Sequence, residues 1–231
     1  MTRRLFSAIV LSLVLFFSAS AFADSGELLN FQGLGDSQTV GNFYNGSGLA
    51  STPNYGVTFS SNFFGLKPAA NGGSGNFSSS VTGPTGTFTI GTAIFIGGTL
   101  GSQVTGTMNV APGFSNGINF YYTAGFSAGQ TETVTIWSGA NGTGTVLATI
   151  VLGNNNGSCS APLYCNWTVA GASFSGTAHS VTFSGPANEL GLADITLGSS
   201  TTAVPEPSPV YLLGTGLIAI SFGKTRKFFG L

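Results

Sequence analysis

Apolar and polar residues alternate over short stretches through the middle of this chain. Residues 133–137 (TVTIW) alternate strictly, and residues 180–183 (SVTF) do the same. A period of two places one face of a strand against a core and the other toward solvent, and we find no stretch of useful length with the helical period. The pattern therefore predicts a chain built from strands.

Glycine-rich segments separate the apolar stretches at short intervals. Five of them contain an Asn-Gly pair, which suits a turn because both residues tolerate positive φ; the pairs begin at residues 45, 71, 116, 141 and 156. The candidate strands are residues 28–33, 56–60, 87–96, 106–110, 118–123, 132–137, 145–152, 167–174, 179–184 and 190–197. Short strands at this spacing predict an all-β fold, a two-sheet antiparallel sandwich of the jelly-roll type.

The N-terminal segment departs from this pattern. Arg3 and Arg4 precede an apolar run over residues 5–17, and small residues then lead to Ala21 and Ala23. This order is typical of a signal peptide, here residues 1–23, which signal peptidase removes after Ala23. A retained anchor helix is the alternative, but it needs about 20 apolar residues and this run is shorter. We therefore expect an exported protein.

A second apolar run lies near the C-terminus, at residues 210–222. At 1.5 Å per residue it reaches about 20 Å, against a hydrocarbon core of about 30 Å, which favours a transient anchor. The basic residues Lys224, Arg226 and Lys227 follow it. By the positive-inside rule they form a cytoplasmic stop and leave the rest of the chain outside.

Residues 204–231 as a whole resemble the PEP-CTERM sorting signal of Gram-negative bacteria. The triplet Pro205, Glu206 and Pro207, the short hydrophobic helix and the basic end follow one another in the order of that signal. The resemblance implies processing near the triplet by an exosortase, a membrane cysteine transpeptidase. It also implies a transient stay in the inner membrane, then a place at the cell surface or in the extracellular matrix, in bacteria that typically make exopolysaccharide.

The segment between the two ends, residues 24–203, is long enough for one domain of ordinary size. Lys67 is its one cation. Its carboxylates are Asp24, Glu27, Asp36, Glu132, Glu189 and Asp194. One cation against six carboxylates gives five net negative charges, which excludes nucleic-acid binding by a basic face.

The borders of this domain look like the first and last strands of galactose-binding-like jelly rolls. The resemblance is carried by residues 29–34 and 40–44 at the start and by residues 188–197 at the end. In that family an acidic residue of the first strand and an Asp-Asp-Ile near the last often hold a structural calcium. Here those positions hold Gln32 and Ala193, so only Asp194 remains as a candidate ligand. Calcium prefers several charged oxygens, and we expect no conventional calcium cage and no other cofactor; Asp194 is otherwise a solvated or turn-capping carboxylate.

Cys159 and Cys165 are the only cysteines of the chain. In an exported protein such a pair predicts a disulfide. It would close a short loop and contribute at most about 2–3 kcal/mol by the loop-closure model. A redox Cys-x-x-Cys site needs a closer spacing.

Two Gly-x-Ser-x-Gly matches, at residues 113–117 and 125–129, raise the question of a hydrolase with His179 as base. A nucleophile elbow requires a strand that leads into a helix, and strand-like sequence follows both matches. A glycosidase needs only two carboxylates at the right separation, and Glu132, Glu189 and Asp194 are available. A cleft of that kind usually brings more charged and aromatic residues, so we predict no enzyme.

We therefore expect a structural protein of the cell surface or exopolysaccharide matrix. The first alternative is a carbohydrate-binding module for extracellular polysaccharide, with stacking by Trp137, Trp167 and Tyr121, or by Tyr122 and Tyr44. Aromatic residues that alternate in strands more often belong to a core. The second alternative is an adhesin that self-associates through exposed strand edges.

Overall fold

Two antiparallel sheets pack face to face in the computed structural model, which describes residues 26–83, 86–125, 130–160 and 162–200. Sheet A has the order β11 (Thr168–Ser173), β8 (Gly117–Ala124), β13 (Leu190–Leu197), β6 (Ala93–Ile96) and β3 (Phe63–Leu66), and β1 (Glu27–Leu29) also pairs with β13. Sheet B has the order β10 (Val146–Leu152), β9 (Glu132–Trp137), β12 (Ala178–Pro186), β7 (Gln103–Phe114) and β2 (Val57–Phe59). The predicted two-sheet antiparallel sandwich is confirmed.

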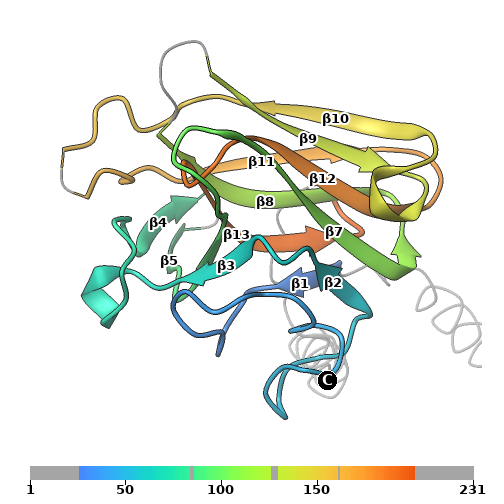
Figure 1. Ribbon diagram of the computed structural model, residues 1–231, viewed down its shortest axis with the longest axis horizontal. Coiled ribbons are helices and arrows are strands. Elements are labelled where there is room, and N and C mark those ends of the chain that lie inside the picture. Colours follow the sequence, from blue (N-terminus) through green and yellow to red (C-terminus); the bar gives the residue numbers. More distant parts are fainter. Residues whose placement is uncertain (1–25, 84–85, 126–129, 161, 201–231) are drawn as a thin grey trace, which may run out of the picture.

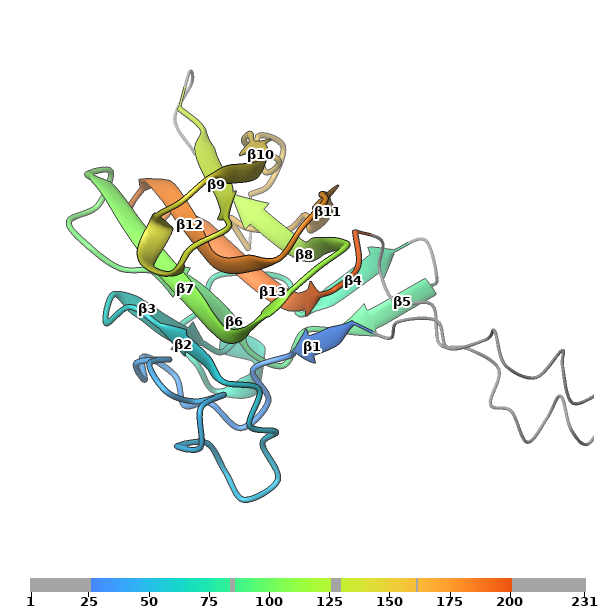
Figure 2. The ribbon, with the colours of Figure 1, turned by 90° about the vertical axis from the view of Figure 1, so that its right-hand side faces the viewer.

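Smaller elements lie outside the two sheets. The hairpin of β4 (Ser80–Gly83) and β5 (Gly86–Thr89) forms a separate ribbon beside sheet A (Figure 2). Two single 3₁₀ turns, η1 (Ala69–Asn71) and η2 (Ala140–Gly142), are the helical elements of the described residues. Within those residues no helix is long and apolar enough to cross a membrane. The predicted leader, sorting triplet, apolar run and basic end all lie outside the described part of the chain.

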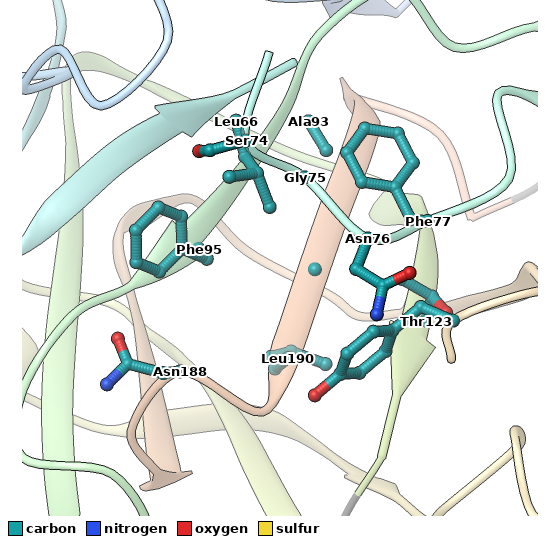
Figure 3. A pocket seen from close by; sticks show the side chains of 12 residues that line it. Leu66, Ser74, Gly75, Asn76, Phe77, Ala93, Phe95, Thr123, Asn188 and Leu190 are labelled. Carbon is teal, nitrogen blue, oxygen red and sulfur yellow. The ribbon is translucent and has the colours of Figure 1, made fainter. Parts of the chain in front are cut away.

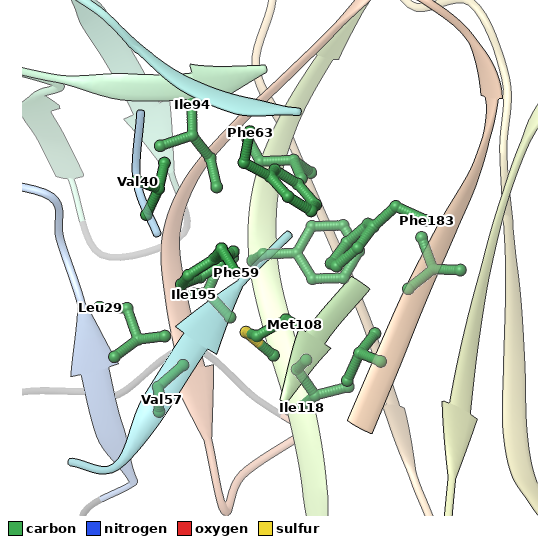
Figure 4. Packing of buried hydrophobic residues seen from close by; sticks show 14 of the residues in the cluster. Leu29, Val40, Val57, Phe59, Phe63, Ile94, Met108, Ile118, Phe183 and Ile195 are labelled. Atoms are coloured by element: carbon green, nitrogen blue, oxygen red, sulfur yellow. The ribbon is translucent and has the colours of Figure 1, made fainter. Parts of the chain in front are cut away.

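Aromatic and branched side chains fill the space between the sheets (Figure 4). Phe63 of sheet A meets Phe183 of sheet B edge to face with ring centroids 5.8 Å apart, and Phe120 meets Phe183 at 6.1 Å. A Cβ at Gly106 would collide with the ring of Phe63, so this ring packs directly on the backbone of β7. Such close packing of large rings is what holds the two sheets together.

The predicted strands agree with the observed ones closely at some positions and poorly at others. β9 and β13 match the predicted residues 132–137 and 190–197, whereas the predicted strand 87–96 is in fact two strands, β5 and β6. The predicted strand 28–33 ends at Leu29, because Phe31 takes a positive φ of 57° and turns the chain. β3 and β4 were not predicted; β3 (FFGL) carries apolar residues on both faces and β4 (SVTG) holds one apolar residue among polar ones.

A β-bulge at Asp194 changes the alternation within β13. Leu192 before it and Ile195 after it both face the core, although they are three positions apart. The register with β8 shifts between Ala193 and Thr196, and Asp194 itself has a φ of 48°. The extra residue is what allows both halves of β13 to bury apolar side chains on the same face.

The outer face of sheet A is partly covered, which has a direct bearing on the site. Ala93, Tyr121 and Ala193 point away from the main core and form a second apolar cluster with Phe77, Val81 and Ile90 from the β4–β5 region. Trp167 and Tyr164 pack against the same cluster from the segment before β11. The outer face of sheet A thus has a cover made of two separate parts of the chain.

Candidate ligand pocket

A pocket of about 220 Å³ lies where the cover over sheet A is incomplete. Its lining comes from β3, β6, β8 and β13 and from the two covering segments, and comprises Leu66, Ser74, Gly75, Asn76, Phe77, Ala93, Phe95, Thr123, Tyr164, Asn188, Leu190 and Gly191. Figure 3 shows Phe95 and Asn188 on one side of the opening and Phe77, Asn76 and Thr123 on the other. None of the lining residues carries a charge.

The floor of the pocket crosses three strands in register. Phe95 of β6 pairs with Gly191 of β13, which pairs on its other side with Thr123 of β8. A Cβ at Gly191 would lie 2.9 Å from the methyl group of Thr123, so a glycine here both permits the close approach of Thr123 and keeps the floor open. Phe64 supports Phe95 from β3, with ring centroids 5.7 Å apart.

One wall is the segment that carries Ser74 to Phe77, and Asp36 holds it in place. The carboxylate of Asp36 accepts hydrogen bonds from the backbone amides of Lys67 (2.7 Å) and Ser74 (3.0 Å). Burial opposes ionisation of Asp36, but these hydrogen bonds outweigh it and leave the pKa of Asp36 below its ordinary value. A charge-assisted clamp at both ends of the turn therefore fixes this wall.

A second wall, next to the first, is Tyr164 in the segment between the two cysteines. Its backbone N–H donates to the carbonyl of Asn76 (3.2 Å), and its carbonyl accepts from the N–H of Ser78 (2.9 Å). Its ring lies against the backbone directly after β8, since a Cβ at Gly125 would be 2.9 Å from it. The two walls are thus joined to one another by a parallel bridge between Phe77 and Tyr164.

The side chain of Asn156 connects the loop that carries this second wall to sheet A by hydrogen bonds. Its side chain is buried, and its amide group donates to the hydroxyl of Thr123 (2.8 Å) and to the carbonyl of Ala124 (3.0 Å). Its side-chain oxygen accepts from the backbone N–H of Asn166 (2.8 Å). One asparagine therefore links the end of β8 to the loop that carries Tyr164.

The predicted disulfide is confirmed, and it closes the same loop. Cys159 and Cys165 are bonded with an S–S distance of 2.04 Å, and Tyr164 lies directly before Cys165. No described cysteine is free. The covalent link therefore restricts the chain on which the second wall stands.

Replacing both cysteines by serine is expected to lower the free energy of unfolding by about 2 kcal/mol, because the closed loop is short. The fold should survive, since Asn156 and the Phe77–Tyr164 bridge still hold the loop. Denaturant unfolding at equilibrium measures the change. Titration of the native protein should find no reactive thiol, and two reactive thiols in the exported protein would refute a stabilising disulfide.

The polar groups around the pocket favour an uncharged ligand. Burial raises the pKa of Tyr164, and the nearby carboxylate of Glu189 raises it further, so the phenol stays neutral. Oε2 of Glu189 is buried and has no hydrogen-bond partner among the described residues. With this carboxylate beside the pocket and no cation in the lining, an anionic ligand would be repelled.

The residues predicted for sugar stacking do not line this pocket. Trp167 lies behind it, edge to face with Phe77 at 5.6 Å, and its Nε1 donates to the carbonyl of Ser78 (2.9 Å). Tyr121 is buried in the cluster beneath the cover, and Tyr44 is buried in the main core. Trp137 lies on the other sheet.

The ionisable residues considered for chemistry are scattered. Glu132 is buried in β9, Glu189 precedes β13, and His179 is half-buried in β12. Burial raises the pKa of Asp194 in its bulge to about 6. No group of three or more His, Cys, Asp or Glu side chains that could hold a metal occurs among the described residues.

The three aromatic residues of the lining were not predicted from the sequence; they are Phe77, Phe95 and Tyr164. Phe95 belongs to a predicted strand but faces outward, and the other two lie in loops. One signal was available, because Tyr164 is the aromatic residue inside the loop that the disulfide closes. For Phe77 and Phe95 the sequence offers no comparable signal.

No protein-family model and no curated protein match the chain. Among solved structures, CsCBM6-3 of Clostridium stercorarium in complex with cellobiose aligns at 16% identity over 52% of this chain and 81% of its own, with a TM-score of 0.32. A carbohydrate-binding module of Cellvibrio mixtus lichenase 5A in complex with cellotriose aligns at 15% identity over 53% of this chain and 85% of its own, with a TM-score of 0.30. The family 11 carbohydrate-binding module of Clostridium thermocellum in complex with a mixed-linked tetrasaccharide aligns at 13% identity over 67% of this chain and 94% of its own, with a TM-score of 0.30. At scores this low the chain is similar to these modules in part, and no site is transferred from them.

Proposed function

We propose that this protein is a non-catalytic structural component of the cell surface or exopolysaccharide matrix, and that it holds uncharged polysaccharide in the pocket over sheet A. The observation that carries the proposal is the lining, which combines the aromatic side chains of Phe95 and Tyr164 with the amides of Asn76 and Asn188 and contains no charge. Apolar walls with a few convergent polar groups are typical of small-ligand sites. A sugar offers such a site both apolar ring faces and hydroxyl groups.

The size of the pocket favours a short stretch of polysaccharide. Its volume of about 220 Å³ is below the range of roughly 300–1,000 Å³ that is usual for ligand pockets. The pocket would therefore hold one or a few sugar units and leave the rest of a chain outside. Low affinity for each unit suits a matrix protein, in which many weak contacts act together.

The route to the matrix is the second part of the proposal. The signal peptide and the PEP-CTERM-like tail would take the chain out of the cytoplasm, and an exosortase would process it near Pro205, Glu206 and Pro207. A disulfide is the form expected of cysteines outside the cytoplasm. Intact mass and fractionation of the native protein test both cleavages, and a full-length chain that stays in the inner membrane would refute the processing.

The fold directs the pocket away from the point where the tail leaves. The pocket lies at Leu190 and Gly191, where β13 begins, and the chain leaves this strand after Leu197, beside Glu27 of β1. At about 3.3 Å per residue, the two ends of β13 are roughly 20 Å apart. A domain held by its C-terminal segment would thus turn the pocket toward the surrounding polysaccharide.

The test of ligand binding is retardation of the full chain, in a mild detergent, in native gels that contain dextran, galactan, mixed-linkage β-glucan or alginate. We expect retardation by at least one of the three neutral polymers and none by the anionic alginate. Tyr164→Ala should weaken the affinity at least tenfold for oligosaccharides of the polymer that binds, because it removes one wall.

Two further variants sharpen this test. Leu163→Ala is the matched control, since Leu163 is adjacent, 55% exposed and absent from the lining. Tyr164→Phe keeps the wall and removes only the hydroxyl group, so it should retain most of the affinity. Oligosaccharide binding that Tyr164→Ala and Phe95→Ala leave unchanged would show that the pocket is not the site.

A further inference from the structure

The outer face of sheet B carries hydroxyl side chains in register across four strands. One row consists of Thr107 (β7), Thr182 (β12), Thr135 (β9) and Thr149 (β10). The next row consists of Thr105, Ser184, Thr133 and Val151 on the same four strands. Seven of the eight positions are therefore Thr or Ser, and all eight are exposed or half-buried. We call these eight residues the hydroxyl face.

Most hydroxyl groups of this face are free to bind a ligand. Those of Thr105 and Ser184 bond to each other at 2.8 Å, and that of Thr182 accepts from Nε1 of Trp137 at 2.9 Å. The hydroxyls of Thr107, Thr133, Thr135 and Thr149 make no side-chain hydrogen bond to the described part of the chain. A row of unused donors and acceptors, each beside a methyl group, offers alternating polar and apolar contacts.

The indole of Trp137 borders this face. Trp137 pairs with Ser180 of β12 and with Val146 of β10, in the row that follows the four threonines. Its hydrogen bond to Thr182 holds the ring toward the threonine row, and the ring is half-buried. An aromatic surface is thus fixed beside the hydroxyl groups.

The charge of the face indicates what it can bind. None of its eight residues is ionisable, and the four strands carry only Glu132, buried on the core face, and His179, near the start of β12. The domain as a whole is acidic. A face with no cation in an acidic domain does not attract an anionic polymer, and a face with no carboxylate does not attract a cationic one.

We infer that the hydroxyl face is a second binding surface for an uncharged polysaccharide chain, so that one domain holds two chains, one on each side of the sandwich. The face belongs to sheet B and the pocket to the outer side of sheet A, and the core lies between them. The inference rests on the proposed function and deepens it, because two sites on opposite sides make the protein a cross-link within the matrix. Neighbouring strands are about 4.7–4.9 Å apart, a spacing comparable to one sugar unit of an extended glycan.

The twist of the sheet argues for a single chain as the occupant. Neighbouring strands rotate by about 20–25°, which amounts to roughly 60–75° over the three steps from β7 to β10. A flat crystalline surface, such as ice, would meet only part of such a face. A flexible glycan can follow the twist and use every row.

The experiment uses the full chain in a mild detergent and a triple variant, Thr107→Val, Thr135→Val and Thr149→Val. Valine keeps the shape and the preference for a strand, so the fold should persist. We expect at least a fivefold weaker retardation by the neutral polymer that retards the unmodified chain. Thr177→Val, in the exposed turn before β12, is the matched control and should behave as the unmodified chain.

A bridging assay separates the two sites. The unmodified chain should link polymer-coated beads to the same labelled polymer in solution, whereas the triple variant and Tyr164→Ala should each lose this bridging. The triple variant should still bind short oligosaccharides in the pocket. Retardation and bridging by the triple variant at the level of the unmodified chain would overturn the inference and leave the pocket untouched.

Three other outcomes also count against the inference that one domain holds two chains. Unchanged oligosaccharide binding by Tyr164→Ala would show that the pocket is not a binding site, and the domain would then not cross-link two chains. Reshaping of ice crystals by the unmodified chain but not by the triple variant, without any retardation, would make ice the partner. The absence of retardation by all three neutral polymers would overturn both proposals.

Discussion

Replacing Glu132 by glutamine is expected to raise the melting temperature of the protein by about 5–10 °C at pH 8 and to change it little at pH 4.5. Glu132 is 1% exposed, on the core face of β9, in register with the buried Leu152. One of its carboxyl oxygens, Oε1, is buried without a hydrogen-bond partner among the described residues. Burial raises the pKa of Glu132 to about 8.

The direction of the effect follows from proton binding. In the unfolded chain Glu132 loses its proton near pH 4.5, whereas in the folded protein it keeps the proton until about pH 8. Between these values the folded state binds more protons, so its stability falls as the pH rises. The buried carboxyl of Glu132 thus lowers the free energy of unfolding by about 3–5 kcal/mol at pH 8 and by almost nothing at pH 4.5. Glutamine has no charge to lose, and the cost disappears.

Thermal unfolding of the full chain between pH 4.5 and pH 9 measures this difference. Glu27→Gln is the matched control, because Glu27 is exposed on β1 and should alter the profile little. Burial also raises the pKa of Asp194, to about 6. In every variant Asp194 therefore adds a similar fall of stability with rising pH, at lower pH than Glu132. If Glu132→Gln and the unmodified chain lose stability in parallel from pH 5 to pH 8, the carboxyl of Glu132 is not buried as described.

The sequence predicted sheet B better than sheet A, and burial explains the difference. β9 alternates strictly because its core face carries the buried Val134 and Ile136 while its outer-face residues are only half-buried. In sheet A the outer face is also covered, so β3 and β6 have apolar residues on both faces and lose the period of two. A cover from distant parts of the chain leaves no local pattern to read.

The two candidate binding surfaces differ in the same way. The threonine rows lie on four strands that were predicted from the sequence, and only the pairing of strands that are distant in sequence was missing. The pocket instead joins Asn76 to Tyr164, which are far apart in the chain and lie in loops. Contacts between loops depend on turn geometry and on single side chains such as Asp36, which a pattern of apolar residues does not reveal.

Asn156→Ala is expected to abolish binding in the pocket although Asn156 touches no ligand there. The variant removes the hydrogen-bond partner of the Thr123 hydroxyl and of the Asn166 N–H. It also removes one of the two donors to the carbonyl of Ala124, which still accepts from the N–H of Asn155. Each buried group that loses its partner costs about 1–3 kcal/mol, so we expect a total loss of about 2–4 kcal/mol.

Most of this loss should be local rather than global. The loop that carries Tyr164 packs on the small outer cluster and shares few contacts with the main core, so it can open while both sheets remain paired. The disulfide between Cys159 and Cys165 keeps the loop closed on itself but does not fasten it to β8. Asn155 bonds to the N–H of Ala124 and the carbonyl of Tyr122, and it would keep the start of the loop on β8. Asn156 links β8 to the N–H of Asn166 at the far end of the loop, so the part that carries Tyr164 should loosen without it.

Hydrogen exchange of backbone amides distinguishes this local opening from general destabilisation. In Asn156→Ala the amides of Tyr164 and Ser78, which join the two walls, should exchange at least tenfold faster, while those of β9 and β12 in sheet B should change much less. Oligosaccharide affinity in the pocket should fall at least tenfold, and retardation through the hydroxyl face should persist, because that face lies on the opposite sheet. Asn54→Ala removes an exposed turn asparagine and should alter neither measurement. If exchange instead rises equally across both sheets, Asn156 supports the whole fold, and the loop that carries Tyr164 does not open on its own.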